Sequence, residues 1–187
     1  KGRTERLKLN AVLVQEEGKV IKTDEKLEWI LLTSEPIETY ADTCNVIDIY
    51  TKRWLIEDFH KAWKSGTKVE DRRMQNSDNL ERVAVILAFV AVRLLQLRVL
   101  KKQEPTSSCG KVLTRVEWRC LWRSVEKSTI PETAPNISWA YYALAKLGGW
   151  YDSKRTGRVG WKAMHKGLSI LNDKVEAIEI AQECLEM

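Results

Sequence analysis

The segment from residue 50 to residue 64 carries the strongest chemical pattern in the chain. A tyrosine, a glutamate and three cationic side chains recur there at helical spacing: Tyr50, Arg53, Glu57, Lys61 and Lys64. Because an α-helix turns about 100° per residue, all five fall within one arc of about 80°. The opposite side of the same helix is apolar: Leu55, Ile56, Phe59, Ala62 and Trp63. The pattern predicts a helix that turns one face to a core and presents one carboxylate among phosphate-binding groups on the other.

An ordinary amphipathic surface helix is the alternative, since charge pairs at spacings of three and four are common on helix surfaces. Two details favour a functional face. The face is mostly cationic, so Glu57 is more than one partner in a balanced ladder of charges. Tyr50 and Trp54 also lie on or beside it, where aromatic rings are not needed for solubility.

The spacing of Tyr50, Arg53, Glu57 and Lys64 resembles the Y-R-E-K signature of a group of bacterial cut-and-paste DDE transposases. The resemblance extends along the chain in the same order, through LNAVL (9–13), LLTSEP (31–36), VIDIYTKRWLIEDFHKAWK (46–64), DNLERV (78–83), FVAVRLLQLR (89–98) and LGGWYDSKRTG (147–157). Only residues 99–137 and the C-terminal helix diverge clearly.

The resemblance implies a metal-dependent catalytic site. In these enzymes three carboxylates on a ribonuclease-H-like fold hold two divalent ions, Mg²⁺ or Mn²⁺. Glu57 would be the third carboxylate, both catalytic and metal-binding, while Tyr50, Arg53 and Lys64, joined by Lys61, would hold phosphates of the transposon end. No aspartate here stands where the family has its other two carboxylates. The chain is therefore expected to be a C-terminal fragment that is inactive alone and binds no metal by itself.

Trp29 is a second residue whose role the resemblance implies. In the family, a tryptophan at this place in LEWILLTSEP stacks on a base flipped out of the transposon end. From the residues alone, the alternative is a tryptophan on the buried face of a β-hairpin.

Two further regions suggest binding surfaces. The basic stretch 146–166 has a net charge of +5, and its segment 153–157 combines hydroxyls, cations and glycine, which suit phosphate groups. The residues expected to contact DNA there are Ser153, Lys154, Arg155 and Lys162. A solvated basic loop is the alternative.

The last helix is acidic and carries a narrow apolar seam. The seam residues expected to form a homodimer are Leu171, Val175, Ile178 and Leu185. Docking of this helix onto its own chain is the alternative.

Composition limits the class of protein. The chain has 187 residues, a net charge of +5, 44% hydrophobic and 30% charged residues, which excludes a disordered chain. Its four cysteines and two histidines form no zinc pattern and indicate reduced thiols in a cytosolic protein. The resemblance implies that this protein acts in the cytoplasm of a bacterium. The longest apolar run, 83–92 between two arginines, is predicted to be too short to span a bilayer, and no membrane partner is expected.

These residues are expected to sit on a helix-dominated α+β fold, a partial ribonuclease-H-like core. Alternation predicts a strand within 6–18, and the segment LEWILLTS (27–34), which stops before Pro36, predicts a second strand that would pair with the first as a hairpin. Helical periodicity predicts helices at about 37–64 (two, or one bent), 79–102, 111–128, 138–147 and 161–187, the last with a weak point near Gly167. Helix 79–102, opened by a capping box of Asp78 and Glu81, is predicted to be buried. Most strands of the sheet that these helices should flank are expected to be missing from this sequence, so some apolar helix faces are expected to lack their cover.

Three regions follow: part of a β-insertion (1–36), helices of the catalytic core (37–104) and a C-terminal region for DNA contact and dimerisation (105–187). The predicted function is the C-terminal portion of a DDE transposase that acts on transposon ends and target DNA as a homodimer. A non-catalytic DNA-binding and dimerisation module, or a transposition inhibitor, is the alternative. A helical protein–protein adaptor unrelated to DNA is a third hypothesis.

Overall fold

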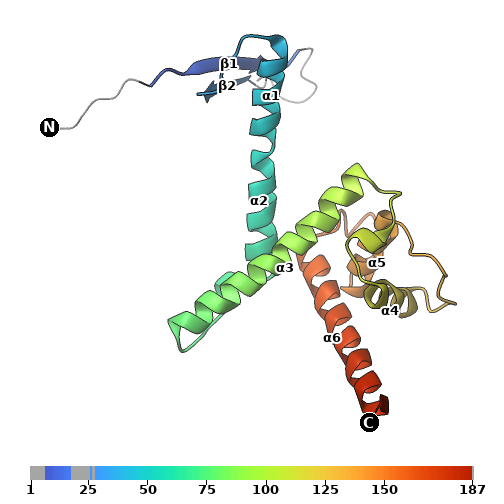
Figure 1. Ribbon diagram of the computed structural model, residues 1–187. Helices are drawn as coiled ribbons and strands as arrows, with labels where there is room; N and C mark the ends of the chain where they lie inside the picture. The colour runs from blue at the N-terminus through green and yellow to red at the C-terminus, as the bar shows by residue number, and fades with distance from the viewer. Residues whose placement is uncertain (1–6, 18–25, 27, 187) are drawn as a thin grey trace. The chain divides into compact units, whose positions relative to one another are not determined.

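The computed structural model describes residues 7–17, 26 and 28–186 (Figure 1). Helices dominate it, and the described strands form one two-stranded sheet, which agrees with the predicted helix-dominated α+β composition. The elements in chain order are β1 (Asn10–Gln15), β2 (Glu28–Thr33), α1 (Tyr40–Thr51), α2 (Arg53–Lys61), the π-helix η1 (Ala62–Gly66), the short 3₁₀ turn η2 (Val69–Asp71), α3 (Ser77–Gln103), the 3₁₀ turn η3 (Cys109–Lys111), α4 (Arg115–Val125), α5 (Ile137–Leu147) and α6 (Trp161–Glu186).

The chain divides into two compact units, Lys1–Ile56 and Glu57–Met187. This division reports compactness alone. The three functional regions expected from the sequence remain a prediction.

In the first unit, β1 and β2 form the antiparallel hairpin that the alternation predicts. Its register pairs Asn10 with Thr33 and Gln15 with Glu28. The hairpin buries Val12 and Leu31 together with Val46 of α1 and leaves the alternate side chains exposed. The predicted turn, with most of the residues between the strands, lies outside the described residues.

Helix α1 begins at a capping box of Thr39 and Asp42, which was not predicted. The backbone N–H of Asp42 donates to Oγ1 of Thr39 (3.3 Å), and the N–H of Thr39 donates to Oδ2 of Asp42 (2.8 Å). The helix ends at Thr51, and α2 starts two residues later, so the two-helix form of the prediction is confirmed.

The prediction that the apolar side of α2 faces a core was wrong. In the described structure no residue of α2 is buried, and Leu55 and Ile56 are 43% and 61% exposed. Burial begins only in η1, where Ala62 and Gly66 are enclosed. There the backbone N–H of Thr67 donates to the carbonyl of Ala62 (3.0 Å), a spacing of five residues that widens the helix.

Helix α3 differs from the prediction at its start and on its surface. Its N-cap is Asn76, whose Oδ1 accepts from the N–H of Asp78 (2.8 Å), rather than a box of Asp78 and Glu81. Of its residues, all described, only Leu87, Ala91, Leu94 and Leu97 are buried. Phe89 and Ile86 are 72% and 61% exposed. The prediction of a wholly buried helix was wrong, whereas the expectation of uncovered apolar helix faces is met on this helix.

Helix α3 is longer than the apolar run at 83–92 on which the prediction of no membrane span was based. Apolar residues continue beyond Arg93, and a window of 18 residues in the 27-residue helix α3 reaches a mean hydropathy of 2.2. By length and composition alone α3 could therefore cross a membrane. This is weak support for a span, because long core helices meet the same criterion.

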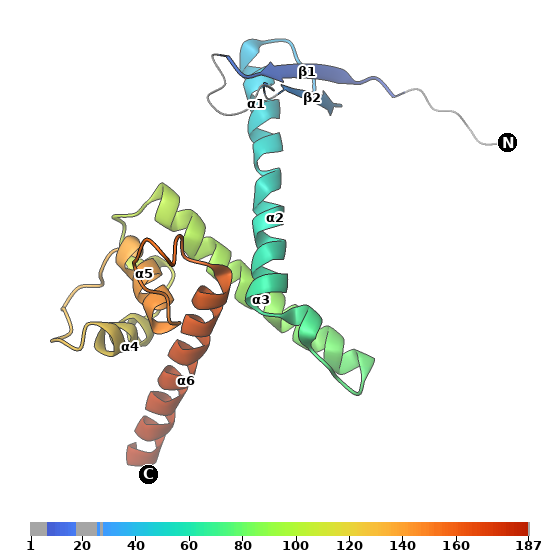
Figure 2. The ribbon, with the colours of Figure 1, turned by 180° about the vertical axis from the view of Figure 1, so that it is seen from behind.

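The second unit has its core where the C-terminal half of α3 meets α4, α5 and α6. Its largest fully buried side chains include Leu94, Leu121, Leu144, Met164 and Leu171. Figure 2 shows α4 and α5 on the same side of α6. Arg93 of α3 donates to Oε1 of Glu117 in α4 (2.6 Å), which adds an ion pair to this packing.

Helix α6 runs without a break through Gly167, where the sequence predicted a weak point. A Cβ atom at Gly167 would overlap the carbonyl oxygen of Leu144, and one at Gly148 would overlap the carbonyl oxygen of Ala163. These glycines therefore allow the backbones of α5 and α6 to touch.

Candidate nucleic-acid interface

A row of aromatic and cationic side chains lies in the first unit. The ring centroids of Trp29 and Tyr50 are 5.2 Å apart, with the ring planes at 59°. The guanidinium carbon of Arg53 lies 5.3 Å from the Tyr50 ring and 4.7 Å from the Trp54 ring. The structure thus brings together three predicted site residues, Trp29, Tyr50 and Arg53, and adds Trp54.

The local fold explains this row. Trp29 lies in β2, in the sheet that packs against α1, and Tyr50 lies in the last turn of α1. Trp29 and Tyr50 are both half-buried, while Trp54 is 49% exposed. Trp29 is therefore partly a packing residue of the hairpin, and it also forms one end of an accessible aromatic row.

Glu57, Lys61 and Lys64 belong to the second unit, so the boundary between the units passes through the predicted signature. Glu57 is half-buried in α2, and Lys61 is the exposed last residue of that helix. Lys64 lies in η1 and forms an ion pair with Glu70 (2.9 Å). Because a π-helix turns less per residue than an α-helix, the 100° projection that grouped Lys64 with the others does not hold through η1.

The residues present do not form a divalent-ion site. Among residues 7–17, 26 and 28–186, no three histidine, cysteine, aspartate or glutamate side chains cluster so that they could hold a metal ion. A hard cation such as Mg²⁺ needs several oxygen ligands, and Glu57 lies in a helix that also carries Arg53 and Lys61. Glu57 can offer one carboxylate to such a site and cannot build it alone.

A second basic region is a groove of about 870 Å³ in the second unit. Six cationic side chains and one carboxylate, that of Asp152, line it. The cations are Arg98, Lys101, Lys102, Lys146, Lys154 and Arg158. Such a surplus of positive charge in a concave surface attracts polyanions.

Three aromatic side chains line this groove: Tyr141, Tyr142 and Trp150. Tyr142 and Trp150 stack with ring centroids 5.6 Å apart and planes at 30°. The ammonium nitrogen of Lys101 lies 5.2 Å from the centre of the Tyr142 ring and 5.7 Å from that of Tyr141. The rings therefore position a cation at the edge of the groove.

The loop from 151 to 157 forms part of the same groove. The N–H of Thr156 donates to Oγ of Ser153 (3.2 Å), and Nε1 of Trp150 donates to the carbonyl of Gly157 (3.2 Å). Gly157 has a φ of 62°, which favours glycine. Of the predicted DNA-contacting residues in this region, Ser153 and Lys154 line the groove, whereas Arg155 and Lys162 are exposed outside its lining.

Five cationic lining residues were not among the predicted site residues: Arg98, Lys101, Lys102, Lys146 and Arg158. A signal for three of them exists in the sequence. Residues 98, 101 and 102 have the spacing of one helix face, and they lie near the end of α3, where cations are also favoured by the helix dipole.

The predicted dimerisation seam is divided between core and surface. Leu171 is fully buried in the core of its own chain, and Val175 packs against that core. Ile178 and Leu185 are 37% and 87% exposed. The part of the seam available to another molecule is therefore its C-terminal half.

Residues 5–93 match the family model of the transposase DDE domain. The matched segment contains the hairpin, α1, α2 and α3 as far as Arg93, and with them Trp29, Tyr50, Arg53 and Glu57. This match supports a place for the chain in a DDE transposase family and a transposase function in general terms. Enzymes of that family act on DNA and generally use divalent metal ions.

Proposed function

We propose that this chain is the C-terminal portion of a cytoplasmic bacterial DDE transposase with the Y-R-E-K signature, acting in cut-and-paste transposition. The observation that carries the proposal is the row of Trp29, Tyr50, Arg53 and Trp54 inside the segment that matches the family model. Partly exposed aromatic rings beside a guanidinium group suit unpaired bases and their phosphates.

In this proposal the first unit holds the transposon end near the scissile phosphate. Arg53 and Tyr50 contact phosphate oxygens, and Trp29 or Trp54 offers a ring to a base that has left the stack. Lys61 and Lys64, which belong to the second unit, are proposed as further contacts to DNA phosphates. These contacts position the DNA and carry no sequence information of their own.

Glu57 is proposed as one carboxylate of the catalytic site. Mg²⁺ or Mn²⁺ is the implied cofactor, and the described residues hold no cluster of three ligands for it. Glu57 would bind such an ion only together with further carboxylates, because one carboxylate is not enough for a hard divalent cation.

The basic groove of the second unit is proposed as a separate contact with the DNA backbone. Lys101, Lys154 and Arg158 would neutralise phosphates there, with Ser153 as a neutral donor. Arg155 and Lys162 would contact the same DNA from outside the groove. Homodimerisation is proposed through the exposed C-terminal end of the α6 seam, at Leu185.

A DNA-binding titration tests this proposal. A labelled duplex with a short single-stranded end is titrated with the chain, with Arg53→Ala and with Lys154→Ala, and anisotropy is followed at several salt concentrations. Each variant should bind more weakly, and its affinity should depend less steeply on salt, by about one counterion per lost contact.

Lys166→Ala is the matched control, since Lys166 is an exposed cation of α6 outside both surfaces. If Lys166→Ala weakened binding as much as Arg53→Ala and Lys154→Ala, the chain would bind DNA through its overall charge, and the proposed surfaces would be rejected.

A further inference from the structure

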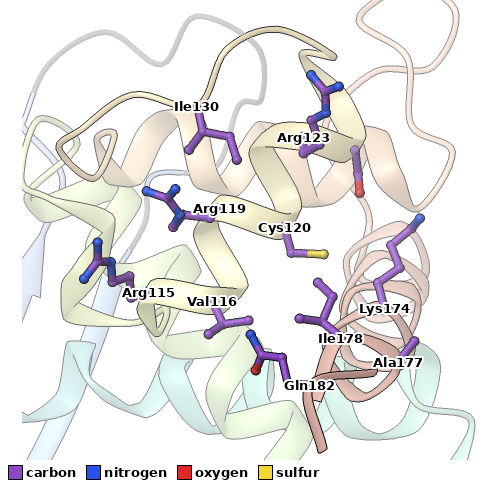
Figure 3. Close-up of a pocket in the computed structure, with 11 residues that line it drawn as sticks. Arg115, Val116, Arg119, Cys120, Arg123, Ile130, Lys174, Ala177, Ile178 and Gln182 are labelled. Carbon is purple, nitrogen blue, oxygen red and sulfur yellow. The ribbon is translucent and has the colours of Figure 1, made fainter. Parts of the chain in front are cut away.

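A second groove lies between α4 and α6 and has no part in the proposed DNA contacts (Figure 3). Its volume is about 710 Å³. The lining residues come from α4, from α6 and from the segment between α4 and α5.

The floor of this groove is apolar and open to solvent. Figure 3 shows Cys120 of α4 and Ile178 of α6 facing each other across it. Val116 and Ile178 are 38% and 37% exposed, and Ala177 is exposed as well. Apolar side chains gathered in an open groove favour contact with an apolar surface of a partner.

The edge of the groove is cationic. Arg115, Arg119 and Arg123 recur at every fourth position of α4, and Lys174 stands on α6. Across the described part of the chain, none of these four forms an ion pair. Arg123 instead donates to the carbonyl of Ser128 (3.2 Å), which fixes its position at the end of the row.

These two features together define the chemistry of the ligand. The phosphates of a DNA backbone would pair with the arginines but would leave the apolar floor uncovered. A small apolar ligand would cover the floor but would leave the four cations without a partner. An amphipathic helix with carboxylates beside an apolar stripe satisfies both. Its acidic residues at every fourth position lie about 6 Å apart along the axis, which is the rise between successive arginines of α4.

We propose that the groove between α4 and α6 is a docking site for an acidic amphipathic helix of another protein. The apolar stripe of that helix would lie on Val116, Cys120 and Ile178, and its carboxylates would pair with Arg115, Arg119 and Arg123. The acidic half of α6 from a second copy of the chain would fit this groove less well. Its apolar residues Ala177 and Ile178 already line the groove of their own chain, so they are not free to enter the groove of another.

The test uses a fluorescein-labelled helical peptide of about 18 residues, roughly five turns, with glutamate at every fourth position beside a stripe of leucine. A second peptide has the same composition in an order that separates leucine from glutamate on the helix surface. The chain should bind the first peptide at least about tenfold more tightly than the second.

Two variants test the two halves of the site. Arg119→Glu should weaken binding of the first peptide by about tenfold through its charge, and Ile178→Ser should do so through the floor. Lys166→Glu is the control, since it makes the same charge change on α6 outside the groove, and it should leave binding within about twofold. Circular dichroism melts of each variant verify that the fold is retained.

Three results would overturn the proposal. The first is equal binding of the two peptides. The second is full displacement of the peptide by duplex DNA together with no effect of Ile178→Ser, which would make the groove a phosphate site. The third is loss of peptide binding as the chain self-associates in sedimentation, which would make a second copy the occupant. None of these bears on the DNA-binding variants Arg53→Ala and Lys154→Ala, so the two proposals can fail separately.

Discussion

Trp29 of the hairpin and Tyr50 of α1 lie ring against ring, 5.2 Å apart between centroids. The contact joins a strand to the helix that carries the start of the predicted signature, although the two residues are 21 positions apart. A base that stacks on Trp29 would therefore lie beside the side chains proposed to hold its phosphate.

Removing the ring of Trp29 should weaken binding of DNA that has a single-stranded end. We expect Trp29→Ala to lose about 1–3 kcal/mol of binding free energy, the usual value of one stacked base, and Trp29→Phe to keep most of it. Fluorescence anisotropy with a labelled end measures both. An equal loss in fully paired duplex would show that Trp29 acts by holding the hairpin in place rather than by stacking.

Replacing Glu57 in a transposase that contains this segment should separate binding from chemistry. Glu57→Gln keeps the shape of the side chain and removes its charge, so end binding should change little while strand cleavage is lost. A gel-shift assay measures binding of a DNA fragment that carries the transposon end, and a cleavage assay on the same fragment measures strand cleavage. Normal cleavage by this variant would remove Glu57 from the catalytic site.

The ion pair between Arg93 and Glu117 should make stability depend on pH. Burial alone would raise the pKa of Glu117, but the hydrogen bond and charge of Arg93 and the hydrogen bonds with Thr114 outweigh it, so the pKa lies below its ordinary value of 4.5. A carboxyl with a lowered pKa stabilises the fold above its unfolded pKa and loses that contribution as pH falls through the folded pKa.

Urea unfolding from neutral pH to below pH 4.5 should therefore show stability falling on the acid side, and less steeply for Glu117→Gln. At neutral pH the variant should be less stable by about 1–3 kcal/mol, because Arg93 and the N–H of Thr114 lose a charged acceptor. Parallel acid profiles for the two proteins would contradict the assignment to Glu117.

Adding one methyl group at Gly167 should destabilise the second unit strongly. The Cβ of Gly167→Ala would overlap the carbonyl of Leu144, so α5 and α6 would have to separate, at a cost of more than about 2 kcal/mol. Gly160→Ala is the matched control, because no atom lies within 4 Å of its added Cβ. Thermal melts of the two variants should differ by several degrees, and equal melting temperatures would contradict the backbone contact.

The four thiols should react at different rates with iodoacetamide. Burial raises the pKa of Cys109 to about 11, and its side chain is inaccessible, so it should be alkylated last. Cys184 is exposed and should react first, with the half-buried Cys44 and Cys120 between them. Peptide mass spectrometry over time gives the order, and early labelling of Cys109 would show that its surroundings open readily.

Local pattern was enough to predict most elements. Alternation within 6–18 and the segment before Pro36 predicted the two strands, and helical spacing over 138–147 predicted α5. The signature face was only partly predictable, because a projection at 100° per residue assumes an unbroken α-helix. The turn at Lys52 and the π-helix at Ala62–Gly66 break that assumption, and neither has a proline or a run of glycines to announce it.

Tertiary packing accounts for the rest. The apolar residues of α3 have no sequence feature that distinguishes buried Leu94 from exposed Phe89, since that difference depends on which side α4, α5 and α6 cover. The basic groove combines residues near 98–102, 141–146 and 150–159, which meet only through the fold. The net charge of each stretch predicted basic character, but it could not predict that the stretches come together in one groove.

The contact between α5 and α6 at Gly148 and Gly167 has a consequence for how tightly the basic loop could bind. The segment 149–160 starts and ends beside this crossing, and Trp150 ties it to Gly157 across the loop. Its conformational entropy is thus largely lost when the protein folds rather than when a ligand arrives. A polyanion that meets Ser153 and Lys154 would encounter a preorganised surface, so more of the electrostatic attraction would remain as binding free energy.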